Sequence, residues 1–327
     1  MATITRNKAG LKLVNRLINP IHFRSTRLIE TLAFDEIRSE KPYNYTALVL
    51  HGLLGSARNW RSFSRILASS LSASTPSSVE WRMVLADLRN HGKSAELKEL
   101  IAPHDIPNAA NDLANLVKSE GWNWPDVVIG HSMGGKVALQ YAQSCARGDY
   151  GDSVKLPKQL WVLDSVPGTV NPEFSDGEVE KVLKTLQGLP SSVPSRKWLV
   201  NHMMTLGFSK SLSDWIGSNL KKSEEGETWA FNLEGAVAMF NSYRKTDYWP
   251  LLENPPEGME IAIVRAENSD RWDADVVQRL ENLASREVDE AGGKVSVFVL
   301  PKSGHWVHVD NPKGLLEIVT PKISSLV

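Results

Sequence analysis

A serine flanked by glycines follows one of the apolar runs of the chain. The sequence Gly-His-Ser-Met-Gly-Gly at 130–135 comes directly after the run Asp126–Ile129 and fits the pattern G-x-S-x-G. A sharp turn between a strand and a helix holds such a serine in a strained backbone conformation and raises its hydroxyl above the sheet. The helix that follows points the positive end of its dipole toward the serine. Ser132 is therefore the predicted nucleophile of an acyl-transfer reaction.

A histidine near the end of the chain supplies the base that such a serine needs. A serine hydroxyl is a weak nucleophile until a base takes its proton, and in folds with this serine turn the chain order is serine, acid, histidine. His305 follows the apolar run Val295–Leu300, in the sequence Ser-Gly-His-Trp-Val-His at 303–308. His305 is the predicted general base. His308 falls at the start of a predicted helix and is interpreted as a structural or surface histidine.

Two aspartates compete for the role of the acid that orients His305. A carboxylate must accept the imidazole N–H to fix its tautomer and to stabilise the imidazolium. Asp164 directly follows the apolar run Leu160–Leu163, whereas Asp270 comes six residues after the run Ile261–Val264. Both strand ends can face the histidine loop in a sheet of this kind. The placement directly at a strand end favours Asp164, and Asp270 stays as the alternative.

Two backbone N–H groups are predicted to form the oxyanion hole that acyl transfer requires. Met133 supplies one of them, because it is the residue after the nucleophile. The sequence His-Gly-Leu-Leu-Gly at 51–55 follows the run Ala47–Leu50, and its glycines allow a close approach of the backbone. The N–H of Leu53 is therefore the candidate for the second donor. His51 is interpreted as a buried imidazole that braces this loop by hydrogen bonds.

A charged loop follows another apolar run. Asp-Leu-Arg-Asn-His-Gly at 87–92 comes after Arg82–Ala86, and ligands of open parallel sheets bind at the carboxyl ends of the strands. This position invites a catalytic role for Asp87. The interpretation that we favour is an Asp–Arg hydrogen-bonded loop that supports the nucleophile turn.

Short apolar runs alternate with helical patterns from about residue 30 onward. Strands separated by helices predict parallel pairing through right-handed crossovers. Together with the serine turn, this alternation predicts an α/β protein of the α/β-hydrolase fold, with a mostly parallel sheet and helices on both faces. The predicted strands are Ala47–Leu50, Arg82–Ala86, Asp126–Ile129, Leu160–Leu163, Ile261–Val264 and Val295–Leu300.

The interval 164–260 interrupts this alternation, because nearly a hundred residues pass without a convincing buried strand. Ser175 and Glu178 match a capping box at the start of one amphipathic helix. Two further helical patterns cover about Pro194–Leu206 and Ser211–Leu220. The interval is therefore predicted to be a helical insertion after Leu160–Leu163, which is the sixth strand in the usual numbering of the α/β-hydrolase fold.

We interpret residues 168–256 as a lid over the carboxyl edge of the sheet, between the core segments 30–167 and 257–327. The insertion leaves and re-enters the core at two strand ends, which is where substrates bind. Its large apolar side chains are candidates for an acyl pocket, although most are expected to pack against the core. They are Trp198, Met203, Met204, Phe208 and Trp215.

The composition excludes several classes of protein. Among 327 residues, 42% are hydrophobic and 23% are charged, as in an ordinary globular protein with a large core. No run of about eighteen apolar residues occurs, so no transmembrane segment is predicted. A single cysteine, Cys145, excludes an intramolecular disulfide and any multi-cysteine metal site. We predict no cofactor and no metal.

The first 29 residues differ in charge from the rest of the chain. They hold six Lys and Arg residues and no acidic residue, while the remainder has 31 basic against 38 acidic residues. A mildly acidic body argues against nucleic acid as a partner. Leu11, Val14, Leu17 and Ile18 recur at helical spacing. Residues 1–29 therefore have the character of a transit peptide and predict import into a mitochondrion, with a chloroplast or the cytoplasm as alternatives.

Four motifs resemble the alpha/beta-hydrolase domain-containing protein 11 family and related short-chain bacterial esterases. The resemblance covers roughly residues 30–327. The motifs are His-Gly-Leu-Leu-Gly-Ser at 51–56, Asp-Leu-Arg-Asn-His-Gly-Lys-Ser at 87–94, Gly-His-Ser-Met-Gly-Gly-Lys at 130–136 and Gly-His-Trp-Val-His at 304–308.

This resemblance implies hydrolysis of carboxylic esters without a cofactor, and it implies a mitochondrial location because the animal members are mitochondrial. It also bears on the acid. In the usual pattern of the fold the acid follows the seventh strand, where Ser269 stands in this chain. Members of this family carry the acid after the sixth strand, which supports Asp164.

The expected function is that of a serine hydrolase that cleaves esters or thioesters of small to medium acyl substrates through an acyl-enzyme. The alternative is a ligand receptor or protein-stabilising partner built on the same fold, with little turnover. Dehalogenase or epoxide hydrolase chemistry needs an aspartate at the nucleophile position, and Ser132 argues against it. Protein partners and the oligomeric state are not predicted.

Overall fold

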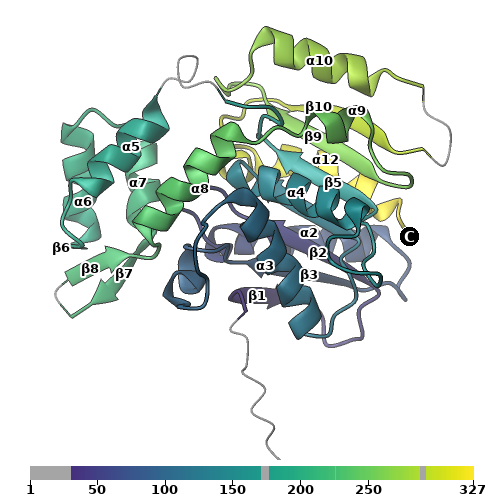
Figure 1. Ribbon diagram of the computed structural model, residues 1–327, viewed down its shortest axis with the longest axis horizontal. Helices are drawn as coiled ribbons and strands as arrows, with labels where there is room; N and C mark the ends of the chain where they lie inside the picture. Colours follow the sequence, from purple (N-terminus) through teal and green to yellow (C-terminus); the bar gives the residue numbers. More distant parts are fainter. Residues whose placement is uncertain (1–30, 171–176, 225, 288–291) are drawn as a thin grey trace, which may run out of the picture. The chain divides into compact units, whose positions relative to one another are not determined.

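The computed structural model describes residues 31–170, 177–224, 226–287 and 292–327, which contain a seven-stranded sheet in the order β1-β3-β2-β4-β5-β9-β10 (Figure 1). Strand β1 pairs with β3 in the antiparallel direction, and the other neighbours are parallel. The strands are β1 (Phe34–Ile37), β2 (Tyr45–Leu50), β3 (Trp81–Ala86), β4 (Val127–His131), β5 (Gln159–Leu163), β9 (Glu260–Ala266) and β10 (Lys294–Leu300).

All six runs predicted as strands are present, but the predicted burial of Val295–Leu300 is wrong, because β10 is an edge strand in which only Val295 and Leu300 are buried. Strands β2 to β5 are almost completely buried. Every residue of β3, β4 and β5 is buried, and in β2 only Tyr45 is partly exposed. Strand β1 was not predicted. Its sequence Phe-Asp-Glu-Ile has two central carboxylates, and an edge strand tolerates such polar residues because one of its sides faces no neighbour.

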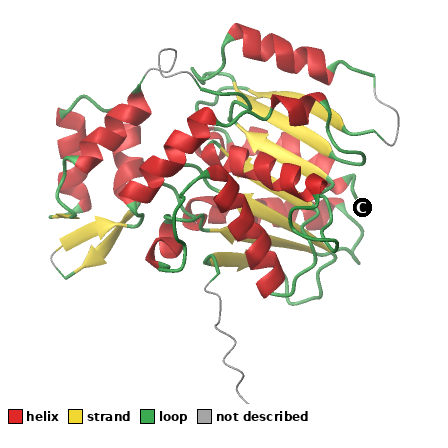
Figure 2. Cartoon of the chain, in the orientation of Figure 1, coloured by secondary structure: helices red, strands yellow, loops and turns green. Residues whose placement is uncertain are grey.

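Helices cover both faces of the sheet (Figure 2). Because side chains alternate along a strand, Leu48 and Leu50 pack into one apolar core with helices α3 and α4, while Ala47 and Val49 pack into a second core with α2 and α12. The helices of the core segments are α2 (Ala57–Ser74), α3 (Ile106–Ser119), α4 (Met133–Arg147), α10 (Ala274–Ala284), α11 (Val307–Asp310) and α12 (Pro312–Ser324), with a short 3₁₀ helix at Gly92–Glu96.

The insertion between β5 and β9 contains more structure than was predicted. Its described part adds a three-stranded antiparallel sheet in the order β6-β8-β7 to the helices (Figure 1). Its elements are α5 (Glu178–Gln187), β6 (Ser192–Val193), α6 (Arg196–Thr205), α7 (Lys210–Ser218), β7 (Leu220–Ser223), β8 (Gly226–Trp229), α8 (Leu233–Lys245) and α9 (Trp249–Glu253).

The predicted start of the first inserted helix is wrong. Helix α5 begins at Glu178 and its N-cap is Gly177, so Glu178 is the first helical residue and not the third, as a capping box would require. Ser175 lies outside the described residues, as does the basic segment 1–29. The helices predicted near 194–206 and 211–220 are present as α6 and α7.

The strand order places the loops after β2, β4, β5, β9 and β10 at one edge of the sheet. The chain runs from β2 to β3 and then crosses back to β4 on the other side of β2, which makes the boundary between β2 and β4 a topological switch point. Ligands of open parallel sheets bind at the carboxyl ends of the strands beside such a point. Leu50 pairs with Gly130, His131 with Leu163, and Ala266 with Leu300, so the loops after these strands begin side by side.

The boundaries of the predicted lid stay a prediction. The described parts of 168–256 and of the two core segments belong to one compact unit. Among the helices of the described ranges, none is both long and apolar enough to cross a membrane.

Candidate active site

Ser132 occupies the turn between β4 and α4 in a strained backbone conformation. Its φ of 52° and ψ of −121° are rare for a residue with a side chain, and such strain is often stored at functional sites. The neighbouring glycines are required, because a Cβ on Gly130 would lie 2.1 Å from the carbonyl oxygen of Gly134. The Ser132 N–H donates to the carbonyl of Leu163 at 2.9 Å, which fixes the turn against β5.

Asp164 is the carboxylate that the fold brings to His305. The Nδ1 atom of His305 lies 2.7 Å from Oδ2 of Asp164 and donates to it. The Asp164 side chain is fully buried, whereas His305 keeps 20% of its side chain exposed. Asp164 also has a positive φ of 44°, directly at the end of β5. Asp270 is an exposed residue on the cavity wall.

Four donors hold the buried carboxylate of Asp164 in place. Besides His305, the backbone N–H of Ala266 donates to it at 3.0 Å, the Ser269 hydroxyl at 2.8 Å and the Trp272 indole at 2.7 Å. A buried charge is stable only when it is paired and hydrogen bonded in this way. Ser269 follows β9, which corresponds to the strand after which the acid usually stands in this fold. Its hydroxyl thus donates to the carboxylate at the end of the neighbouring strand β5.

The electrostatics of the pair keep the carboxylate charged and the imidazole neutral. Burial raises the pKa of Asp164, but the hydrogen bond and charge of His305 and the Trp272 and Ala266 donors outweigh it and lower that pKa to about 2. Burial and the positive charge of Arg271 lower the pKa of His305 below its ordinary value of 6.5, against the opposing effect of Asp164. A neutral imidazole next to a charged carboxylate can accept a proton at neutral pH.

Two further histidines surround His305. Nε2 of His131 lies 2.7 Å from the carbonyl oxygen of His305 and donates to it, so the second residue of the serine motif positions the backbone of the histidine loop. The ring of His308 stacks on Trp60, with ring centroids 4.0 Å apart. Burial lowers the pKa of His131 well below its ordinary value and that of His308 to about 3. His131 was missed because the pattern G-x-S-x-G leaves this position open.

The loop after β2 lies against the turn that holds Ser132. A Cβ on Gly52 would lie 3.1 Å from the Ser132 Cβ, so any side chain at this position would require Ser132 or the loop to shift by a few tenths of an ångström. Leu53 and Met133 line the same cavity as Ser132. Within the described ranges, neither of their N–H groups donates to a backbone or side-chain acceptor. Both amides therefore have an unused donor at residues that line this cavity.

His51 braces this loop by hydrogen bonds, as predicted from the sequence. Its Nε2 accepts the N–H of Leu88 at 3.0 Å, and its Nδ1 donates to the carbonyl of Gly52 at 2.8 Å. Burial lowers the pKa of His51 to about 4, so it accepts from Leu88 as a neutral imidazole.

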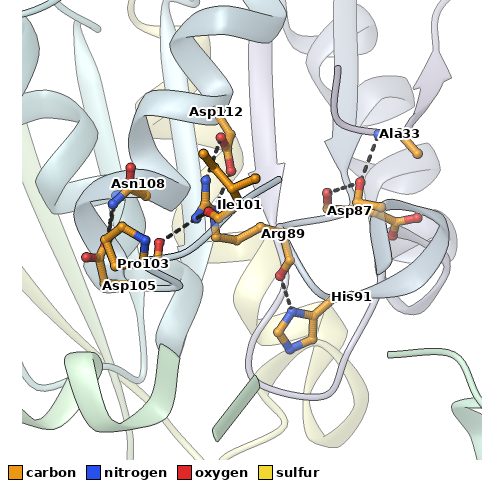
Figure 3. Close-up of polar contacts among 10 residues, drawn as sticks. Ala33, Asp87, Arg89, His91, Ile101, Pro103, Asp105, Asn108 and Asp112 are labelled. Atoms are coloured by element: carbon orange, nitrogen blue, oxygen red, sulfur yellow. Dashed lines mark hydrogen bonds and ion pairs between the residues drawn. The ribbon is translucent and has the colours of Figure 1, made fainter. Parts of the chain in front are cut away.

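The interpretation of the loop at 87–92 as a bonded Asp–Arg pair is wrong. Asp87 accepts the backbone N–H groups of Ala57 and Lys93 at 2.7 and 2.9 Å. Arg89 instead forms a buried bidentate pair with Asp112 of α3 at 2.7 and 2.9 Å (Figure 3). The sequence does not reveal this partner, because Asp112 lies in a helix 23 residues away. Asp87 thus ties the start of α2 to the loop after β3.

A mostly apolar cavity joins these groups. It has a volume of about 160 Å³ and contains Ser132 and His305 in its wall together with Arg271. Of the candidate pocket residues from the insertion, Met203 and Phe208 pack in the core cluster, as most were expected to do, while Trp198 and Met204 are exposed and do not line the cavity. Trp215 does line the cavity. The insertion contributes Glu178, Val179, Val182, Leu212, Trp215, Phe240 and Tyr243.

The comparison with protein families agrees with the fold. Residues 47–318 match the model of the family described as "Alpha/beta hydrolase family". The chain belongs to the alpha/beta hydrolase family. In the described ranges of this alpha/beta hydrolase, no cluster of three His, Cys, Asp or Glu side chains has the arrangement of a metal site.

Relatives of this alpha/beta hydrolase carry names of ester-cleaving enzymes. It is 24% identical over 333 residues to the mouse "sn-1-specific diacylglycerol lipase ABHD11", covering 97% of this chain and 96% of that protein. The zebrafish protein of the same name is 25% identical, covering 85% of this chain and 82% of its own length. The resemblance to this group inferred from the motifs is thus confirmed at the level of the family.

Solved structures support the fold of this alpha/beta hydrolase. A structure titled "Marine microorganism esterase" superposes with a TM-score of 0.67 at 22% identity, covering 89% of this chain and 98% of the other. A second, titled "Crystal Structure of E-2-(Acetamidomethylene)succinate Hydrolase", gives 0.63 at 16% identity, covering 89% and 99%. Similarity at these identities establishes the architecture and leaves the substrate to the chemistry of the site.

Proposed function

We propose that this protein hydrolyses carboxylic ester or thioester bonds of small to medium acyl substrates through an acyl-enzyme. The observation that carries the proposal is the contact of 2.7 Å between His305 Nδ1 and the buried Asp164, at the cavity that Ser132 lines. Because Nδ1 donates to Asp164, Nε2 of His305 is the ring nitrogen that can accept the proton of the Ser132 hydroxyl.

The roles of the residues follow from this arrangement. The Ser132 hydroxyl attacks the substrate carbonyl while His305 takes its proton and then returns it to the leaving group. Asp164 stays charged, fixes the tautomer of the imidazole and stabilises the imidazolium. The N–H groups of Leu53 and Met133 hold the oxyanion. A water molecule, activated in turn by His305, then releases the acid and restores Ser132.

The cavity supports an acyl group of limited size. Its volume of about 160 Å³ is below the range of about 300–1,000 Å³ for pockets that take drug-sized ligands. Its apolar wall from the insertion, including Trp215 and Phe240, suits the hydrocarbon part of an acyl chain. We therefore propose that residues 168–256 act as a lid above the nucleophile.

The acid limb of the activity profile reports on His305. A general base works in its neutral form, so activity rises as pH increases through the pKa of His305, which burial and Arg271 hold below 6.5. The midpoint of the acid limb of kcat/KM is expected below pH 6.5. Replacing Arg271 with glutamine removes a positive charge, which raises this pKa and moves the midpoint toward higher pH.

This pH dependence is measured as kcat/KM from pH 4 to 9 on one soluble ester. The exposed Arg279 on α10 lies outside the cavity and provides the control Arg279→Gln, which should leave the midpoint unchanged. A midpoint that moves equally in both variants, or toward lower pH in Arg271→Gln, would contradict the assignment of His305 as the base.

Turnover separates a hydrolase from the alternative of a ligand receptor with little activity. The test uses p-nitrophenyl esters and acyl thioesters of graded chain length, together with a diacylglycerol because relatives are named for that substrate. We expect kcat/KM to be highest for short to medium acyl chains and to fall for longer ones. Binding of these compounds without turnover would favour the receptor.

We also propose delivery to a mitochondrion. The support is the basic, acid-free segment 1–29 with its apolar residues at helical spacing. A fusion of this segment to a fluorescent protein should enter mitochondria. Accumulation in plastids or retention in the cytoplasm would each favour the corresponding alternative.

A further inference from the structure

Lys136 is a buried cation that the proposed reaction does not use. It lies in the first turn of α4, four residues after Ser132, and is completely inaccessible to solvent. A positive charge is unfavourable at the N-terminus of a helix because the helix dipole is positive there. Burial of a charged group adds a second cost unless the group is fully hydrogen bonded. A lysine at this position therefore requires a compensating role.

The Lys136 ammonium uses all three of its donors on backbone carbonyls. Nζ donates to Gly168 at 2.6 Å, to Tyr243 at 2.6 Å and to Thr246 at 2.9 Å. Its Nζ also lies 4.4 Å from the centre of the Tyr243 ring. Burial lowers the pKa of Lys136 to about 7, and the carboxylate of Asp247 opposes this shift. Carbonyl dipoles, rather than an ion pair with a described carboxylate, thus hold this cation.

The three carbonyls belong to two segments of the insertion that are far apart in the sequence. Residues 167–170 lead into the insertion, and residues 243–248 run from the end of α8 to the start of α9; we call these two segments the junction. They are also bonded to one another, since the Val170 N–H donates to Arg244 at 2.9 Å and the Tyr248 N–H donates to Pro167 at 3.0 Å. Lys136 therefore connects helix α4, which follows Ser132, to both segments of the junction.

The junction is built for close packing and leads directly to the cavity. A Cβ on Gly168 would lie 2.5 Å from the indole nitrogen of Trp249, so a glycine is required where α9 packs against the first segment. Tyr243, whose carbonyl receives Lys136, lines the cavity together with Phe240 from the same helix α8. Movement at the junction would thus displace the apolar wall relative to Ser132.

We propose that Lys136 is a positioning residue that fixes the insertion relative to the nucleophile helix and thereby sets the part of the cavity that receives the acyl chain. The inference rests on the proposed function for its effect on substrates. Its structural part, the stability of the junction, can be measured without any substrate.

The test compares Lys136→Met with Leu139→Ala, which removes buried volume from the same helix at a side chain that does not line the cavity and makes no hydrogen bond to the junction. Hydrogen exchange at the amides of Val170 and Tyr248 is expected to accelerate at least about tenfold in Lys136→Met, because both amides lie in the junction. The same amides should stay close to the native rate in Leu139→Ala. Equal acceleration in both variants would mean that Lys136 only contributes to general stability.

The kinetic part of the test separates kcat from KM. We expect Lys136→Met to raise KM for p-nitrophenyl octanoate by about tenfold, because the acyl wall shifts by a fraction of an ångström or more. For p-nitrophenyl acetate, kcat should stay within about threefold because the turn at Ser132 is intact. A loss of the same size on both esters would overturn the positioning role.

A second variant keeps the proposal open to contradiction if Lys136→Met does not fold. Lys136→Gln keeps two N–H donors and should shift the exchange of the junction amides and the octanoate KM in the same direction by smaller amounts. No shift at these amides in Lys136→Gln would overturn the proposal. If the native protein turns over no ester, the proposed function fails, and the exchange rates still decide whether Lys136 holds the junction.

Discussion

Replacing Ser132 with alanine is expected to lower kcat for ester hydrolysis by about 10⁴- to 10⁶-fold, as removal of a serine nucleophile does in other serine hydrolases. The variant keeps the glycines that permit the turn and the helix that follows it, so the fold and the cavity should persist. It removes the only oxygen that can form the acyl-enzyme at this position. Residual activity should come from substrate binding and the oxyanion donors alone.

The measurement is steady-state kinetics on a p-nitrophenyl ester, with unfolding followed in parallel to show that the variant is folded. Ser144→Ala is the matched control, because Ser144 lies near the other end of α4 and outside the cavity. It should retain activity within about threefold. Retention of more than a tenth of the native kcat in Ser132→Ala would exclude Ser132 as the nucleophile.

The second large effect is expected for the carboxylate. Asp164→Asn should lower kcat by about 10⁴-fold, because a neutral amide neither fixes the tautomer of His305 nor stabilises the imidazolium. The loss should appear in kcat more than in KM, since Asp164 is fully buried beneath His305 and lies outside the cavity wall. The Ala266 N–H and the Trp272 indole both donate to Oδ1, which the amide retains as its oxygen, so the side chain should keep its position and the fold is expected to survive.

Asp270→Asn is the natural comparison for this variant. Asp270 affects His305 through its charge, which raises the pKa of the imidazole. Its removal is expected to change kcat by less than about tenfold and to move the acid limb toward lower pH. If kcat collapses in Asp270→Asn while Asp164→Asn stays active, then the acid is Asp270 and the contact seen at Asp164 is structural.

Much of the fold could be predicted from the sequence because the central strands are buried on both faces. Continuous apolar runs such as Val-Val-Ile at 127–129 identify these strands without knowledge of their neighbours. Strand β1 and the sheet of the insertion escaped prediction for the opposite reason. Their residues, such as Leu-Lys-Lys-Ser in β7, are polar and partly exposed, so the pattern resembles a loop.

The candidate site shows where local sequence stops being informative. The residues at strand ends, Ser132, Asp164 and His305, could be selected because a parallel sheet gathers such ends at one edge. Partners that depend on tertiary packing could not. Nothing near Arg89 in the sequence points to Asp112, and nothing near Lys136 points to carbonyls more than a hundred residues away. The catalytic roles themselves stay predictions until they are measured.

The most direct test of the proposed mechanism is the reaction of the native protein with a fluorophosphonate, followed by mass spectrometry of its peptides. A serine activated by His305 forms a covalent adduct at its hydroxyl oxygen. We expect one adduct on the peptide that contains Gly130–Gly135, at Ser132, and none in Ser132→Ala. No labelling of the folded native protein, or an adduct at another residue, would contradict the proposal that Ser132 is the nucleophile of a hydrolase.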